Sequence, residues 1–181
     1  MNHLTQSIFT LFIAAVTTLG ACAQSDKASR PSPPAQAEAT VDGTTVTIDY
    51  SQPSVKGRKI FGELEPYGKV WRTGANEATT FEVSSDVTIE GQALPKGKYA
   101  LFTIPQENED WTVIFNKTAE QWGAYDYDES QDALRVQVSP EKSSSMTEKL
   151  TFDIAESGEV TFMWADTKLS FDVASAGQAS N

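Results

Sequence analysis

The sequence is almost without histidine and cysteine. Its only histidine is His3 and its only cysteine is Cys22, so neither residue type occurs after Cys22. A domain without them cannot run a Ser-His-Asp or Cys-His mechanism, and it cannot build the usual zinc, copper or haem centre. Disulfide bonds within the domain are excluded as well. We therefore expect no cofactor, and the chemistry left is that of carboxylates, lysines, tyrosines and hydroxyls.

Positive charge is also scarce, because 14 Lys and Arg stand against 25 Asp and Glu, giving a formal net charge of -11. A surface that binds phosphate groups needs clustered cations. No glycine-rich phosphate loop occurs either. The composition therefore argues against nucleic acid and against anionic lipid headgroups as partners.

An apolar run occupies residues 8–21, which is too short for a membrane-spanning helix but suits the core of a signal peptide. It ends in Leu-Gly-Ala-Cys at residues 19–22. This resembles the lipobox of bacterial lipoproteins, in which a small residue precedes the cysteine that is cleaved and acylated. We therefore expect Cys22 to be lipidated, although no Lys or Arg precedes the apolar run. An ordinary secretory signal with an incidental cysteine is the alternative.

These features divide the chain into four parts. Residues 1–21 are expected to be a lipoprotein signal peptide. Residues 22–39 are rich in Ala, Ser, Gln and Pro, and we expect them to form a disordered tether behind the lipidated cysteine. The folded domain is expected at 40–173, followed by a disordered tail at 174–181. The protein would then be exported and lipid-anchored in the cell envelope, on the periplasmic face or in the outer membrane.

Period-two alternation of apolar and polar residues dominates the domain and predicts half-buried strands. Without any long helical pattern, it predicts an all-β fold, a single antiparallel β-sandwich or flattened barrel of about eight to ten strands. A turn is expected at 94–97, and hairpin connections are expected at 156–159 and 165–168. The alternating segments are 45–50, 111–115, 134–138, 152–154, 160–164 and 169–173.

Four segments of the chain carry distinctive motifs. The segments are 50–58, 70–79, 97–105 and 121–123, and the motif residues are Trp71, Arg72, Gly74, Asn76 and Glu77. Taken together, the segments resemble domain-of-unknown-function family 2911, a family of exported bacterial proteins. The resemblance covers roughly residues 40 to 173 and implies an exported, single-domain, all-β protein. It implies no mechanism and no catalytic residues.

The densest polar cluster lies at residues 67–80, around that motif. Trp71 offers a stacking face, and Arg72, Asn76 and Glu77 offer forked hydrogen bonds to a carbohydrate or a peptide end. The alternative is architectural: Trp71 caps the core, Arg72 pairs with Glu77, and Asn76 satisfies loop amides.

A second cluster contains Trp122 and Tyr125, beside amides and acids. These residues are candidates for the other wall of the same site, or else a loop folded over the end of the sandwich with its aromatic side chains inward. Asp126, Asp128, Ser130 and Asp132 have the alternate spacing of a calcium loop. The expected Gly and Glu of such a loop are replaced by Gln131 and Gln137, so no metal site is expected.

The sequence thus predicts a membrane-anchored binding or accessory module for carbohydrate or cell-wall fragments. One alternative is a hydrolase of envelope glycans that uses Glu77 with Glu63 or Asp126 as acid and base. A structural lipoprotein that binds other proteins through its sheet edges is the other alternative. The sequence does not identify catalytic residues, so enzymatic activity stays open.

Overall fold

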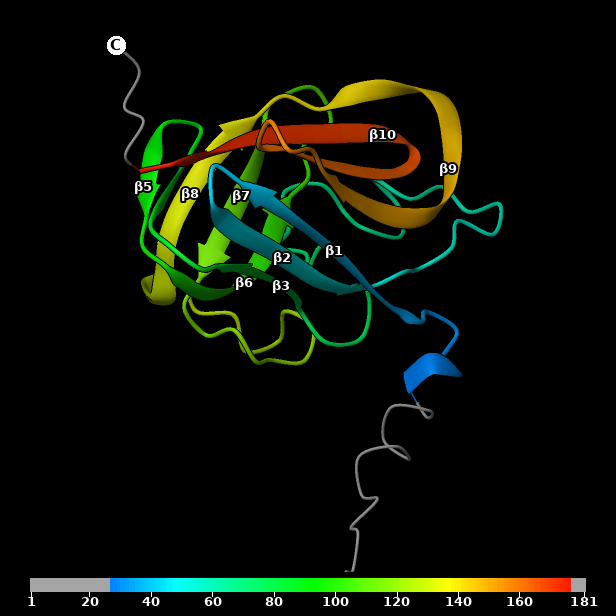
Figure 1. Ribbon diagram of the computed structural model, residues 1–181. Coiled ribbons are helices and arrows are strands. Elements are labelled where there is room, and N and C mark those ends of the chain that lie inside the picture. Colours follow the sequence, from blue (N-terminus) through cyan, green and yellow to red (C-terminus); the bar gives the residue numbers. More distant parts are fainter. Residues whose placement is uncertain (1–26, 177–181) are drawn as a thin grey trace, which may run out of the picture.

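The computed structural model describes residues 27–176, which are built mainly of strands, with two long irregular loops at residues 52–78 and 117–128 (Figure 1). A single 3-10 turn, η1 (Glu129–Gln131), precedes β8. The strands are β1 (Pro34–Val41), β2 (Thr44–Ser51), β3 (Thr79–Val83), β4 (Val87–Ile89), β5 (Gln92–Leu94), β6 (Gly97–Ile104), β7 (Trp111–Asn116), β8 (Asp132–Val138), β9 (Glu141–Ile154) and β10 (Glu159–Ser175).

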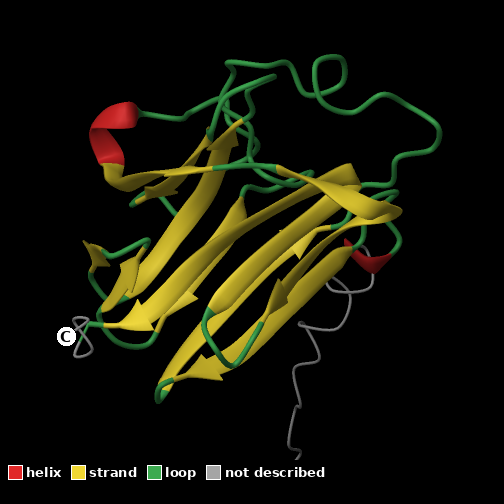
Figure 2. Ribbon diagram, turned by 90° about the horizontal axis from the view of Figure 1, so that it is seen from above, coloured by secondary structure: helices red, strands yellow, loops and turns green. Residues whose placement is uncertain are grey.

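The strands form two antiparallel sheets. One sheet has six strands in the order β1-β2-β3-β6-β7-β8, and the other has four in the order β5-β4-β10-β9. The two layers pack face to face and remain open at their sides (Figure 2). The predicted all-β sandwich is therefore confirmed, and the sheets do not close into a barrel.

Alternation along the strands explains the layers, because inward side chains are buried and their neighbours are not. In β2, Val46 and Ile48 are fully buried, whereas Thr45 and Thr47 are half-buried. The core between the sheets is rich in aromatic rings. Phe81 and Phe115 of the larger sheet make edge contacts at centroid distances of 5.0 Å, and Phe115 contacts Phe171 of β10 at 5.9 Å. Such rings supply large buried apolar areas.

The first strand was not expected from the sequence. Residues 34–39 were assigned to a disordered tether, but they form most of β1, which pairs with β2 from Pro34 opposite Ser51 to Val41 opposite Thr44. That assignment is wrong because Ala35, Ala37 and Ala39 pack against the core although their side chains are small. The domain therefore begins well before residue 40. The proposed signal peptide and Cys22 lie outside the described residues.

The other end of the chain needs two corrections. The hairpin connection expected at 165–168 is absent, because β10 runs through it, with register shifts on either side of Ala165, whose φ is 55°. A β-bulge of this kind bends a strand without reversing it. The disordered tail expected from residue 174 is wrong for residues 174 and 175, because β10 pairs with β4 as far as Ser175 opposite Val87. The predicted turns at 94–97 and 156–159 are both present.

Gly158, in the turn between β9 and β10, provides a test of this packing. A Cβ atom there would lie 2.0 Å from the backbone oxygen of Val173, and the residue has φ +97°. Gly91 has a similar φ of +75°, but a Cβ there would meet nothing within 4 Å. We expect Gly91→Ala to lower the free energy of unfolding by about 1–2 kcal/mol, from backbone strain alone. Gly158→Ala should cost about 1–3 kcal/mol more, from the clash.

Urea unfolding of both variants measures this difference. Equal losses at the two positions would show that Val173 does not approach the turn as closely as described.

Candidate functional site

The motif loop at residues 72–78 is held at both ends by the larger sheet. Trp71 exchanges two backbone hydrogen bonds with Thr103, at 2.8 and 2.9 Å, and Thr79 begins β3. Inside the loop, the Thr79 hydroxyl donates to the carbonyl of Thr73 at 2.9 Å, and it would lie 2.8 Å from a Cβ on Gly74. The glycine of the motif is therefore required by the tight turn of the loop rather than by a ligand.

Trp71 does not provide a stacking face for a ligand, so its assignment as a binding residue is wrong. Its side chain is only 4% exposed and its ring stacks on Trp164 at a centroid distance of 5.6 Å. Its indole N–H donates to the carbonyl of Gly74 at 3.2 Å. The strand position of Trp71 points it between the sheets, so the architectural alternative describes this residue correctly.

Asn76 and Glu77 bind the N-terminal segment of the chain. Asn76 donates from its amide to the carbonyl of Ser32 at 3.1 Å and to the hydroxyl of Ser51 at 3.2 Å. Glu77 forms ion pairs with Arg30 at 2.8 Å and with Lys27 at 3.1 Å. The expected ion pair between Arg72 and Glu77 is therefore wrong. The Glu77 carboxylate pairs instead with Arg30 and Lys27, which lie in the segment that the sequence assigned to a tether.

The same contacts set the protonation of Glu77. Burial raises its pKa, but its backbone hydrogen bond and the donors of Arg30 and Lys27 outweigh burial, and the pKa lies below its usual value. An ionised carboxylate held in this way cannot serve as the general acid of the glycan hydrolase considered above. Glu63, one of its suggested partners, lies at the surface beside Lys59 at 3.7 Å.

Trp122 and Tyr125 do share a surface with the motif loop, as the sequence suggested. Glu77 forms a β-bridge with Trp122, and the backbone N–H of Gly123 donates to the carbonyl of Asn76 at 3.1 Å. Trp122 is 53% exposed and Tyr125 is 83% exposed, so the alternative of inward aromatic side chains is wrong for both. Arg30 lies over the Trp122 ring, at 5.9 Å from its centroid. These rings are available to a partner.

Arg72 lines a small recess with a carboxylate that the sequence did not single out. The recess has a volume of about 250 Å³, and Glu65 and Tyr125 line it together with Arg72. Burial raises the pKa of Glu65 to about 7, although Arg72 and Arg58 lower it. Nε of Arg72 is buried without a hydrogen-bond partner among residues 27–176. Glu65 follows an exposed leucine in an irregular loop, so no sequence pattern marks it.

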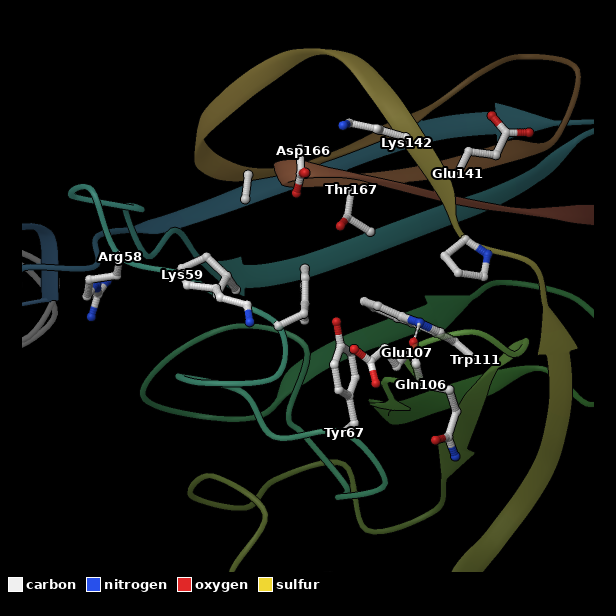
Figure 3. Close-up of a pocket in the computed structure, with 14 residues that line it drawn as sticks. Arg58, Lys59, Tyr67, Gln106, Glu107, Trp111, Glu141, Lys142, Asp166 and Thr167 are labelled. Carbon is white, nitrogen blue, oxygen red and sulfur yellow. Dashed lines mark hydrogen bonds between the residues drawn. The ribbon is translucent and has the colours of Figure 1, made fainter.

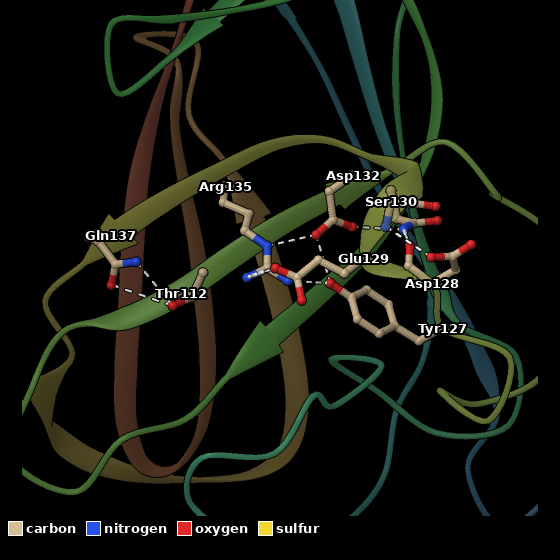
Figure 4. Close-up of polar contacts among 9 residues, drawn as sticks. Thr112, Tyr127, Asp128, Glu129, Ser130, Asp132, Arg135 and Gln137 are labelled. Carbon is tan, nitrogen blue, oxygen red and sulfur yellow. Dashed lines mark hydrogen bonds and ion pairs between the residues drawn. The ribbon is translucent and has the colours of Figure 1, made fainter.

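Two of the three acids with calcium-loop spacing, Asp128 and Asp132, accept hydrogen bonds from protein donors (Figure 4). The carboxylate of Asp132 accepts from Asn116 at 2.7 Å, from the Tyr127 hydroxyl at 2.7 Å and from Arg135 at 2.6 Å. Burial, together with Asp132, raises the pKa of Tyr127 to about 12. Asp128 caps η1 by accepting from the backbone of Ser130. Within residues 27–176 no cluster of three or more potential metal-ligating side chains occurs.

A cleft that the sequence did not indicate has a volume of about 590 Å³. The loop at 58–67 forms one wall, the long β9 and β10 strands form another, and residues 106 and 107 close a third side (Figure 3). Its floor is apolar, because Ile60, Phe61 and Trp111 are buried. Tyr67 points its hydroxyl toward the space between the walls.

The rim of the cleft carries charges of both signs. Lys142 of β9, Glu107 and Asp166 line it, and none of the three forms an ion pair or a side-chain hydrogen bond with residues 27–176. Arg58 differs, because it donates to the carbonyls of Val55 and Ser54. Unpaired charges around an apolar floor are typical of a small-molecule site.

Fold and cleft together define a two-sheet, all-β sandwich protein with a cleft between the loop at 58–67 and the long strands β9 and β10. The chain belongs to the family described as protein of unknown function (DUF2911), whose model matches residues 32–173. The match starts just before β1, in agreement with the early start of the domain. Searches among curated proteins and among solved structures gave no match. No helix within residues 27–176 has the length and hydropathy needed to cross a bilayer.

The raised pKa of Glu65 predicts a pH dependence of stability. The folded protein binds the Glu65 proton more tightly than the unfolded chain, so the stability that it contributes is complete below about pH 4.5 and is lost as pH rises through about 7. Glu65→Gln should remove this decrease, and the variant should gain stability over the wild type at pH 8 but not at pH 4.

Urea unfolding at several pH values measures the effect. Glu63→Gln is the control, because Glu63 is exposed two residues away. The assignment fails if both variants follow the wild-type pH profile.

Proposed function

We propose that this protein is a lipid-anchored bacterial envelope protein whose sandwich binds a small zwitterionic cell-wall fragment in the 590 Å³ cleft. The lipobox-like sequence before Cys22 supports export and acylation, on the periplasmic face or in the outer membrane. The cleft is the observation that carries the binding proposal. Its volume falls within the range of about 300–1,000 Å³ that small-molecule sites have.

The lining favours one kind of ligand. Lys142 can bind a carboxylate, and Glu107, on the opposite side of the opening, can bind an ammonium group. Asp166 lies on the same wall as Lys142, since its neighbour Thr167 pairs with Lys142, and adds a second carboxylate to the rim. The floor at Phe61 and Trp111 accepts an apolar side chain or a methyl group. A neutral sugar has no group for these charges, whereas the peptide part of a cell-wall fragment carries both amines and carboxylates. The sequence predicted carbohydrate or cell-wall fragments as ligands. The proposed ligand class is narrower, because it contains only the cell-wall fragments that carry peptide.

The alternative of a carboxylate-based hydrolase draws support only from Glu65, whose raised pKa suits a proton donor. A glycosidase needs a second carboxylate about 5 to 10 Å away. No other acid among the described residues lines the recess of Glu65. Binding without turnover is therefore the function that the geometry favours.

Substitution of Lys142 tests the cleft. Lys142 has no ion-pair partner within residues 27–176, so Lys142→Met removes a ligand contact without breaking a native one. We expect the affinity for disaccharide-tetrapeptides released from peptidoglycan to fall about tenfold, which corresponds to about 1.4 kcal/mol for a charge-assisted contact. Isothermal titration calorimetry measures the affinity.

Lys149→Met is the matched control, because Lys149 is exposed on the same strand and does not line the cleft. The disaccharide without its peptide should bind much more weakly than the complete fragment. Equal binding by the two Lys variants, or equal binding of both ligands, contradicts the proposal.

A further inference from the structure

Two exposed aromatic side chains lie beside the point where the described chain begins. The chain has four tryptophans, and Trp71, Trp111 and Trp164 are at most 4% exposed, whereas Trp122 is 53% exposed. Tyr125, three residues further on, is 83% exposed. Trp and Tyr are amphipathic, and both are enriched where a protein meets the interface of a bilayer. Their exposure on one loop therefore needs a partner with an apolar and a polar side.

The N-terminal segment brings the lipid attachment close to these rings. Lys27 and Arg30 are fixed on Glu77, which forms a β-bridge with Trp122, and Arg30 lies over the Trp122 ring. Cys22 precedes Lys27 by five residues. Five residues span at most about 18 Å even when fully extended. An acyl chain on Cys22 therefore holds this side of the domain within about two nanometres of the membrane.

We propose that the aromatic face, formed by Trp122, Tyr125, Lys27 and Arg30, lies against the headgroup region of the membrane that holds Cys22. The proposal rests on the acylation of Cys22 in the proposed function. In Figure 1 the blue segment at Lys27 and the yellow-green loop after β7 lie at the lower side, whereas β10 ends at the upper left. The loops that carry the family motif would thus face the membrane.

Charge decides what kind of membrane contact this is. Lys27 and Arg30 are already paired with Glu77, and the exposed Glu120 and Asp126 flank the aromatic residues. The aromatic face is therefore not attracted strongly to an anionic membrane surface. The contact relies on burial of Trp122 and Tyr125 among zwitterionic headgroups, so added salt should weaken it little.

The fluorescence of Trp122 can report its contact with lipid, because the other three tryptophans are buried inside the sandwich. The acylated protein is reconstituted into phosphatidylcholine vesicles that contain lipids brominated near the headgroup or deep in the acyl chain. We expect headgroup-proximal bromine to quench tryptophan emission more than deep bromine, and Trp122→Phe to remove this quenching.

Lys27→Ala with Arg30→Ala should reduce the quenching while the protein stays on the vesicles. Met146→Ser, at a site 62% exposed on β9, is the matched control and should change nothing.

Three results would overturn the inference in distinguishable ways. A vesicle-bound protein without quenching of Trp122 leaves the anchor intact and rejects the membrane contact. A native protein that carries no acyl chain on Cys22 by mass spectrometry and does not bind vesicles rejects both the anchor and the contact. Protection of Trp122 from acrylamide by soluble glycans, without quenching by lipid, makes the aromatic face a carbohydrate surface instead.

Discussion

The structure depends on the stack of Trp71 on Trp164 between the two sheets. Phe61 makes edge contacts with both indoles, at 5.8 and 6.1 Å, and with Trp111 at 4.7 Å. This cluster lies under the motif loop on one side and forms the floor of the cleft on the other. Burial of such rings is the main favourable contribution to folding, so the same contacts that join the sheets also hold in place the cleft and the aromatic face, for which binding is proposed.

Around this cluster, polar residues of the family motif mainly connect parts of the chain. Asn76 binds the segment before β1, and Glu77 binds two cations from the same segment. A surface ion pair alone contributes little, but several contacts to one segment restrict its position. These contacts fix the start of the domain to the loop next to Trp122, so the lipid proposed at Cys22 would lie on the same side of the domain as Trp122. The cleft, which includes Lys142 and Asp166, is supplied by other elements and is free for a ligand.

Much of the fold could be predicted, because alternation such as that of Val46 and Ile48 is a local signal of half-buried strands. The exceptions are informative. β1 was missed because alternating alanines bury little area each, and the bulge at Ala165 resembles a turn until its partner strand is known. For the site, the meeting of the motif loop with Trp122 and Tyr125 was one of the two alternatives that the sequence offered. The ion pairs of Glu77, the burial of Trp71 and the raised pKa of Glu65 were not, since each depends on residues distant in sequence.

The sequence by itself determined the fold class, the family and the exclusion of histidine and cysteine chemistry from the domain. These follow from composition and from short-range periodicity, which need no knowledge of partners. Only the tertiary structure decided which motif residues are free. Whether Trp71 or Trp122 meets solvent, and whether Glu77 or Lys142 is already paired, depends on contacts between segments tens of residues apart. Burial and pairing are properties of such contacts, so no local pattern in the sequence carries them.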